Sequence, residues 1–274
     1  MDLQELIAAR NTTVPDNDPI QNLLLNIQKL DAKRPENLFK LLEKVSQLER
    51  KLSGSDTSAE TELRSWLQSY RADLAMHVEN LRQHFGNTLA EGLQPLGFQL
   101  KGQYPKLHAG LFTFDLNFDK GRCRIWYGPE QEALGDTALD APKVVDTVRK
   151  LREKLGSQLG PPDLLARLRL AYRHVRLEQS DGIVPLLALL PFMALSVQTN
   201  SFRNDPRKEH YRPYTRADFS FDLYRLRAIG PALRLGIATR QQTRKRTDFL
   251  WVPAREEVEG GDYFATIELK EENP

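Results

Sequence analysis

Cysteine is almost absent from this chain, whose 274 residues include only Cys123. A single cysteine excludes an intramolecular disulfide and any metal site built from several thiolates. Long apolar runs are absent too: the most apolar stretch, 183–197, is interrupted by Pro185 and Pro191, so we expect no membrane span. The first residues lack the basic and apolar regions of a signal peptide. We therefore expect a cytoplasmic protein.

Phosphate-binding and metal-binding motifs are also missing. The sequence has no G-x-x-x-x-G-K-[ST] loop, which excludes an ATPase of the P-loop kind. Residues 115–121 spell part of a calcium loop, but the glycine comes one position late and Trp126 stands where a bidentate Glu is required. His77 and His84 are two helical turns apart, which is about 10 Å and too far to share one metal ion. We expect no cofactor.

Charge, by contrast, is concentrated near the C-terminus. Residues 203–246 hold twelve Lys or Arg against four Asp or Glu, whereas residues 247–274 hold two against eight. The whole-chain charge of +2 hides both blocks. The basic block also contains five Phe or Tyr residues, and Phe202 directly precedes it. A basic segment with interspersed aromatic side chains is what a surface that binds nucleic-acid phosphate needs.

The pattern of residues 1–93 predicts a helical arm. After two short helical segments, Pro35 opens a helix whose apolar residues keep a 3-4 spacing up to Leu52. A polar connection follows, and a second amphipathic helix of about 28 residues continues past Leu63 to Leu89. Two such helices predict a helical hairpin that resembles a coiled coil, and we expect it to bind a protein partner or a second copy of the chain.

Residues 94–274 predict an α+β body with a mostly antiparallel sheet. Alternation over 111–127 around Gly121 predicts a β-hairpin, and helices are expected to begin near Pro142 and Pro161. Cys123 is expected to be a small core residue. From Asp218 onward the apolar period shortens to two, which predicts a further set of strands: 219–223, 233–239, 248–252 and 263–269.

Two segments of the basic block are candidates for phosphate contact. The loop Arg240–Thr247 is expected at the tip of a hairpin, and the segment 203–216 alternates arginine with tyrosine. The candidate nucleic-acid contacts are the basic side chains of both: Arg203, Arg207, Lys208, Arg212, Arg216, Arg240, Arg244, Lys245 and Arg246. A solvated surface explains the loop as well, and an ordered connection whose arginines pair with Asp218 and Asp222 explains the segment 203–216.

A nuclease is the most concrete enzymatic alternative. Glu268-Leu269-Lys270 has the E-x-K spelling of restriction-type nucleases, in which two acids bind Mg²⁺ and a lysine assists the attacking water. Asp248 could be the first acid. Only four residues follow Lys270, so the helix that usually follows this motif is missing, and the spelling occurs by chance in many chains. A solvent-facing strand end is the simpler interpretation.

These observations favour a non-enzymatic nucleic-acid-binding or accessory subunit of a larger complex. Its expected ligand is nucleic acid, DNA rather than RNA, held by the basic surface around residues 203–246. A protein–protein adaptor whose basic surface pairs with an acidic partner is the alternative from another class.

Overall fold

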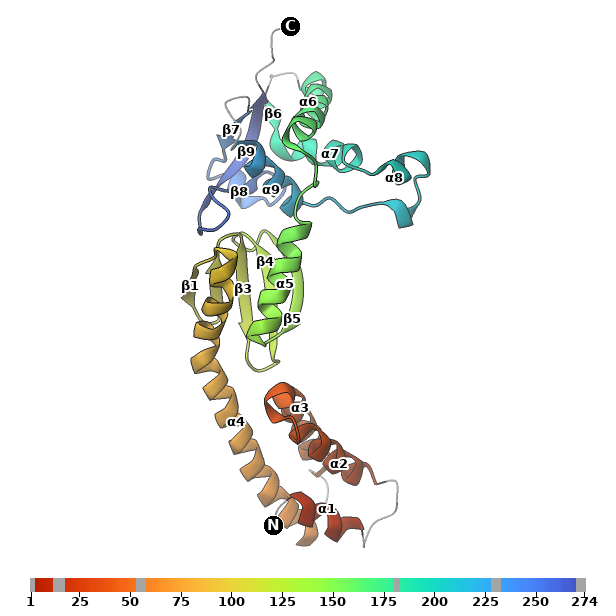
Figure 1. The fold of residues 1–274 in the computed structure, drawn as a ribbon, viewed down its shortest axis with the longest axis vertical. Helices are drawn as coiled ribbons and strands as arrows, with labels where there is room; N and C mark the ends of the chain where they lie inside the picture. Colours follow the sequence, from red (N-terminus) through yellow and green to blue (C-terminus); the bar gives the residue numbers. More distant parts are fainter. Residues whose placement is uncertain (1–2, 12–17, 53–57, 180–182, 228–232, 270–274) are drawn as a thin grey trace. The chain divides into compact units, whose positions relative to one another are not determined.

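The computed structural model describes residues 3–11, 18–52, 58–179, 183–227 and 233–269 (Figure 1). The chain divides into two compact units. The helical unit comprises Met1–Asn87 together with Phe118–Gly121, and the mixed unit comprises Thr88–Asn117 together with Arg122–Pro274.

The helical unit is built from four helices: α1 Leu3–Asn11, α2 Pro19–Asp31, α3 Arg34–Leu52 and α4 Ser58–Leu93. The Asp18 carboxylate caps α2 by accepting hydrogen bonds from the amides of Ile20 and Gln21. Apolar side chains from all four helices form one core cluster. The predicted helix pair is thus present as α3 and α4, and α4 has 36 residues rather than about 28.

The mixed unit begins with a five-stranded antiparallel meander. Its strands follow one another in order: β1 Leu100–Gln103, β2 Lys106–Ala109, β3 Phe112–Asn117, β4 Arg122–Tyr127 and β5 Glu132–Ala138. The pairing of β3 with β4 confirms the predicted hairpin. Cys123 is fully buried in β4, and burial raises the pKa of its thiol to about 12, so it is the expected core residue.

The turn of that hairpin packs within the helical unit. The Phe118 ring meets the Phe85 ring edge-on at 6.0 Å between centroids, and the Arg82 guanidinium lies 5.1 Å from the Phe118 centroid. Gly121 has a φ of 61°, and a Cβ there would lie 2.1 Å from Phe39. Glycine is therefore required at this position by both backbone conformation and space.

Two helices follow the meander where the sequence expects them. The Asp140 side chain caps α5, Ala141–Lys154, by accepting from the amide of Lys143 at 3.0 Å, and α5 packs along β5 (Figure 1). Helix α6 covers Pro161–Glu178. Both begin at or beside a proline, whose fixed φ suits a first helical turn.

A second, smaller sheet completes the mixed unit. The remaining elements are β6 Val184–Pro185, α7 Leu190–Ser196, α8 Asn200–Asn204, α9 Arg216–Arg227, β7 Leu233–Ile237, β8 Leu250–Pro253 and β9 Gly261–Leu269. Strand β9 pairs antiparallel with β6, β7 and β8. One core cluster joins this sheet to α6, α7 and α9. The fold is α+β, with a long helical region before the two sheets.

The strand predicted over 219–223 is wrong, because these residues lie in α9. Phe219 and Leu223, one helical turn apart, are both buried in the core. The intervening Ser220 and Asp222 are buried as well, and hydrogen bonds satisfy both side chains. In the sequence, these two polar residues alternate with apolar ones, which is the pattern of a strand with one polar face. A local period of two thus arose inside a helix.

The predicted hairpin that carries the basic loop is also wrong in its pairing. Strands β7 and β8 each pair with β9, and the segment between them contains a 3₁₀ turn, Gln242–Arg244.

Across the described ranges, no helix is both long and apolar enough to cross a membrane.

Candidate nucleic-acid interface

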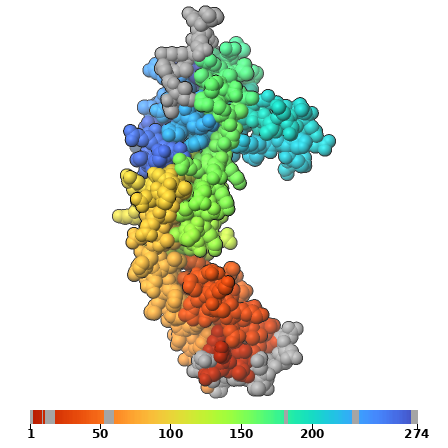
Figure 2. Space-filling view, viewed as in Figure 1, coloured from red at the N-terminus to blue at the C-terminus, as the bar shows by residue number. Residues whose placement is uncertain are grey.

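The first basic segment begins in a part of the mixed unit that projects from its body. Helix α8 and the loop after it stand out in the space-filling view (Figure 2). Gln198 closes the base of this projection: its side chain donates to the Arg212 carbonyl at 2.8 Å and accepts from the Arg212 amide at 2.9 Å. The rings of Phe202 and Tyr211 meet edge-on at 5.5 Å, so these two aromatic side chains pack against each other within the loop.

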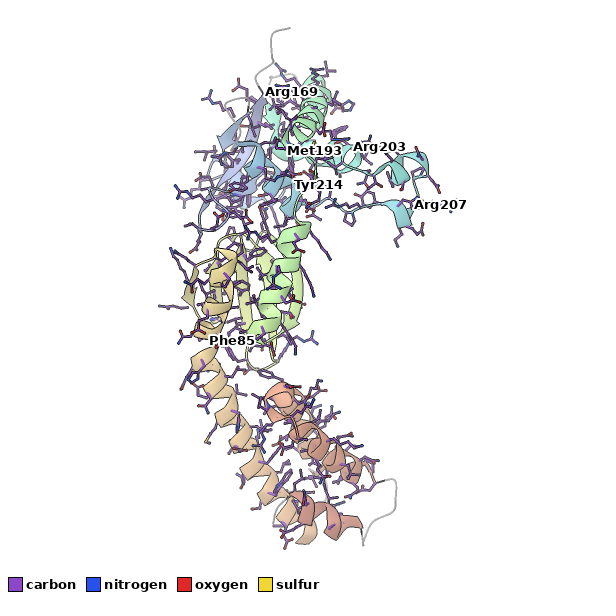
Figure 3. All side chains as sticks on the ribbon, viewed as in Figure 1. Phe85, Arg169, Met193, Arg203, Arg207 and Tyr214 are labelled. Carbon is purple, nitrogen blue, oxygen red and sulfur yellow. The ribbon has the colours of Figure 1, made fainter. Side chains whose placement is uncertain are left out.

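Two arginines of the projection have partners within it. Arg203 and Arg207 are labelled in Figure 3, with Tyr214 at the base. Arg203 Nη2 donates to the Ser196 carbonyl at 2.6 Å, and this carbonyl at the C-terminal end of α7 also accepts from Arg167. Arg207 forms an ion pair with Asp205, with Nε 2.9 Å from Oδ2.

Arg212 is hydrogen-bonded to the backbone at the end of α5. Its guanidinium donates to three carbonyls there, those of Lys154 at 3.4 Å, Gly156 at 3.0 Å and Ser157 at 3.3 Å. Carbonyls at a helix C-terminus lack intrahelical donors, and the planar fork of arginine can satisfy several at once. The predicted phosphate contact at Arg212 would have to compete with this structural role.

Acidic residues of α9 bind the same α5–α6 connection from the other side. Asp222 is 1% exposed and accepts from the Ser157 amide at 2.9 Å, the Tyr214 hydroxyl at 2.9 Å and Arg225 Nη1 at 3.0 Å. Asp218 accepts from the Gly156 amide at 2.9 Å, and burial raises the pKa of its carboxyl.

The interpretation in which arginines of the 203–216 segment pair with these two acids is therefore wrong within the described residues. The arginine that pairs with Asp222 is Arg225, which lies outside this segment and also donates to the Leu159 carbonyl at 2.7 Å. The donors to Asp218 are the Gly156 amide and the amide and hydroxyl of Thr215.

Arg216 and Arg246 attach the second basic segment to the body of the mixed unit. Arg216 donates to the Arg246 and Phe249 carbonyls, at 2.6 Å each, and burial lowers the pKa of its guanidinium. Arg246 donates to the Gln131 carbonyl. The Gln131 side chain in turn accepts from the Trp251 amide at 2.6 Å. Gln131, in the turn after β4, thus contacts both Arg246 of the basic loop and Trp251 of β8.

The basic loop Arg240–Thr247 has an ordered backbone. Gln242 accepts from the Thr239 amide at 2.8 Å, and the Thr243 amide donates back to the Thr239 carbonyl at 3.1 Å. Arg240, Arg244 and Lys245 are exposed on this frame. In the part of the chain that the structure describes, their side chains have no hydrogen-bond or ion-pair partner, as is also true of Lys208 in the projection.

Two of the three residues of the nuclease alternative lie on or next to strands of the second sheet. Glu268 lies across from Arg234 on β7, with Arg234 Nη1 3.8 Å from its carboxylate, while Asp248 precedes β8 and accepts from the Thr247 hydroxyl. Lys270 lies outside the described residues. Among the described residues, no group of three or more His, Cys, Asp or Glu side chains could hold a metal ion.

The sequence did not indicate Gln131, Gln198 or Arg167, because each acts on a main-chain group whose position only the fold defines. Comparison with known proteins adds nothing to this geometry: no family model, curated protein or solved structure matches the chain.

Proposed function

We propose that the protein is a non-enzymatic nucleic-acid-binding or accessory subunit, and that the basic loop is its phosphate contact. The observation that carries the proposal is the set of three exposed cations, Arg240, Arg244 and Lys245, on an ordered backbone and without side-chain partners within the described ranges. A loop that is already ordered loses little entropy when it binds, and its cations need not abandon existing bonds. DNA is the first ligand to test.

The proposed phosphate contact uses fewer residues than the nine that the sequence suggests. Arg203, Arg212, Arg216 and Arg246 each donate to main-chain carbonyls, so using them on phosphate would break these hydrogen bonds. The helical unit would recruit a protein partner or a second copy, and Met76 on α4 is 63% exposed there.

A binding assay with two charge-matched variants tests the loop. R240Q/R244Q/K245Q removes three cations from the basic loop, and R203Q/R207Q/K208Q removes three from the projection. Fluorescence anisotropy with labelled duplex and single-stranded DNA and RNA, at several salt concentrations, should show loss of binding for the loop variant on unrelated sequences. The slope of log K against log salt on duplex DNA should fall by about 0.9 for each phosphate that the variant no longer neutralises.

The projection variant should keep most of the affinity and the slope. Equal losses of affinity in both variants would show that net charge alone drives the binding. No binding by the unaltered protein, or an unchanged affinity in the loop variant, would reject the proposal and favour an adaptor that binds an acidic protein.

A further inference from the structure

A groove of about 470 Å³ lies in the mixed unit between α6 and the second sheet, and its lining contains no residue of the basic loop. Tyr172 and Arg176 line it from α6, Arg234 from β7, and Thr266 and Glu268 from β9. Val184 and Ile267, both buried, contribute apolar surface. A volume of this size and a mixed lining are typical of sites for small organic ligands.

The polar groups of the groove are available. The side chains of Tyr172, Arg176 and Thr266 have no hydrogen-bond or ion-pair partner within the ranges that the structure describes. The contact that the described residues give the Arg234 side chain is a long one, 3.8 Å to Glu268, and this side chain is 83% exposed. An ion pair at that distance and exposure contributes little to stability, so the Arg234 guanidinium can bind a ligand at a small cost in free energy.

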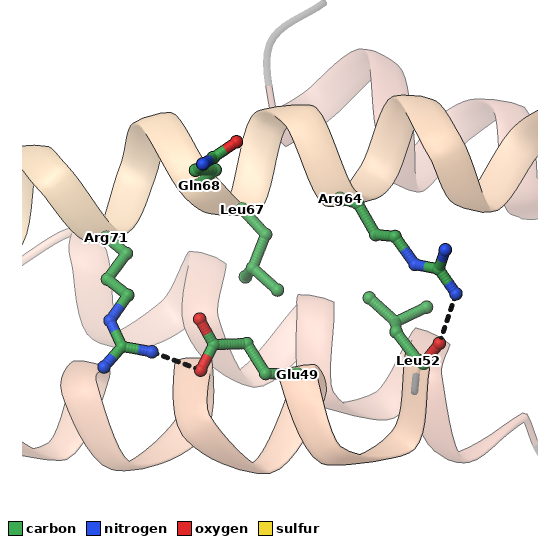
Figure 4. A pocket seen from close by; sticks show the side chains of 6 residues that line it. All are labelled: Glu49, Leu52, Arg64, Leu67, Gln68 and Arg71. Carbon is green, nitrogen blue, oxygen red and sulfur yellow. Dashed lines mark hydrogen bonds and ion pairs between the residues drawn. The ribbon is translucent and has the colours of Figure 1, made fainter. Parts of the chain in front are cut away.

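A second groove of about 350 Å³, between α3 and α4 in the helical unit, shows the contrast (Figure 4). It also has two arginines in its lining. There, however, Arg71 is paired with Glu49, and Arg64 donates to the Leu52 carbonyl at 2.6 Å, as the dashed lines in the figure mark. The arginines of that groove connect α3 and α4. In the α6 groove, the described structure gives Arg176 no side-chain partner and Arg234 only the long contact with Glu268.

Gly236 leaves room for the Thr266 hydroxyl in the lining of the α6 groove. A Cβ at this position would lie 2.1 Å from Thr266 Oγ1, so only glycine leaves the hydroxyl its present place. Arg176, Arg234 and Thr266, from three different elements, thus line one groove together with Tyr172. Several donors from different directions suit a tetrahedral anion better than a planar one, and arginine is the side chain that binds phosphate oxygens in pairs.

We propose that this groove binds a phosphate monoester attached to a small planar body, the chemistry of a nucleoside monophosphate. The guanidiniums of Arg176 and Arg234 and the Thr266 hydroxyl donate to the phosphate, and the body lies against Tyr172 and the apolar surface. Glu268 opposes the anion and limits its affinity. The phosphate can belong to a free nucleotide or to the 5′ end of a short oligonucleotide. The site does not depend on the basic loop.

Isothermal titration calorimetry on the full chain tests this site with AMP, adenosine and a tetranucleotide with or without a 5′-phosphate. AMP should bind and adenosine should bind at least about tenfold more weakly, because it lacks the charge-assisted hydrogen bonds. R176Q and R234Q should each weaken AMP binding about tenfold, and T266V severalfold. E268Q should strengthen AMP binding, since it removes the one negative charge in the lining of the groove.

Arg173 provides the matched control. It is exposed on the same helix and absent from the lining of the groove, so R173Q should leave AMP affinity unchanged. Binding of the 5′-phosphorylated tetranucleotide as well as AMP would identify a chain end as ligand, and binding of AMP alone would identify a free nucleotide. Both support the site. Equal affinity for AMP and adenosine, no AMP binding at millimolar concentration, or full AMP affinity in both R176Q and R234Q would overturn it.

The basic loop variant R240Q/R244Q/K245Q separates this inference from the proposed function. It should bind AMP like the unaltered protein even where it no longer binds duplex DNA. Conversely, R176Q should keep the duplex affinity.

Discussion

The two basic segments of the mixed unit resemble each other in sequence and differ in what their cations contact. In the segment 203–216, three arginines donate to main-chain carbonyls at the ends of helices or in connections, and a fourth pairs with Asp205. In the basic loop, only Arg246 does so among the described residues, and Arg240, Arg244 and Lys245 are exposed. A run of positively charged residues therefore contains two kinds of side chain: some donate hydrogen bonds to the backbone, and others remain exposed. Which kind a residue becomes depends on whether nearby main-chain carbonyls lack a donor.

Arginine can meet that demand because its five N–H groups form a planar fork. Arg212 reaches three carbonyls at the end of α5 with one side chain. A lysine ammonium has three donors on one atom and cannot span the same set. In the segment 203–216 the cation whose side chain has neither a hydrogen-bond nor an ion-pair partner, within the described residues, is a lysine, Lys208.

The comparison is tested most strongly at Asp222, on the acidic side of the network that holds the first segment. D222A should lower the free energy of unfolding of the mixed unit by about 3–5 kcal/mol, because it leaves Arg225, the Tyr214 hydroxyl and the Ser157 amide without their acceptor. Urea denaturation followed by tryptophan fluorescence measures this change. D205A, on an ion pair at the surface, should cost little. A decrease below about 1 kcal/mol at Asp222 would mean that this network does not hold the α5–α6 connection.

The next largest effect is expected at Arg212, where geometry can be separated from charge. R212K keeps the positive charge and removes the fork, so it should cost about 2 kcal/mol of unfolding free energy as the carbonyls at the end of α5 lose their donors. R207K, a matched change at an exposed ion pair, should be close to neutral in the same denaturation experiment. Equal stability of R212K and the unaltered protein would remove the distinction between the two segments.

Much of the architecture could be predicted from sequence, because it rests on local signals. The helix pair follows from the apolar spacing between Leu38 and Leu52, the start of α5 from Asp140, and the β3–β4 hairpin from alternation around Gly121. Helix α9 could not be predicted. Its period was hidden by Ser220 and Asp222, which are polar and yet buried because partners distant in sequence bond them.

The candidate site was only partly predictable, for a related reason. The sequence shows which residues carry charge, but not where the chain leaves a carbonyl without a donor. The partners of Arg212 are 55 to 58 residues away, and the partner of Arg246 is 115 residues away. The groove beside α6 brings Arg176 and Arg234 together across a similar separation, and no local motif connects them.

The smallest effect is expected where the comparison predicts no structural role. R240Q/R244Q/K245Q should change the free energy of unfolding by no more than about 0.5 kcal/mol, since the described structure gives these side chains no partner. At low salt the variant should even be slightly more stable, because three like charges on one short loop repel one another, and this gain should vanish above about 0.15 M salt as screening increases. Denaturation at two salt concentrations measures both. A decrease above about 1 kcal/mol would show that these cations hold the loop as Arg246 does, and weaker nucleic-acid binding by the variant would then report a disordered loop instead of the removal of phosphate-binding side chains.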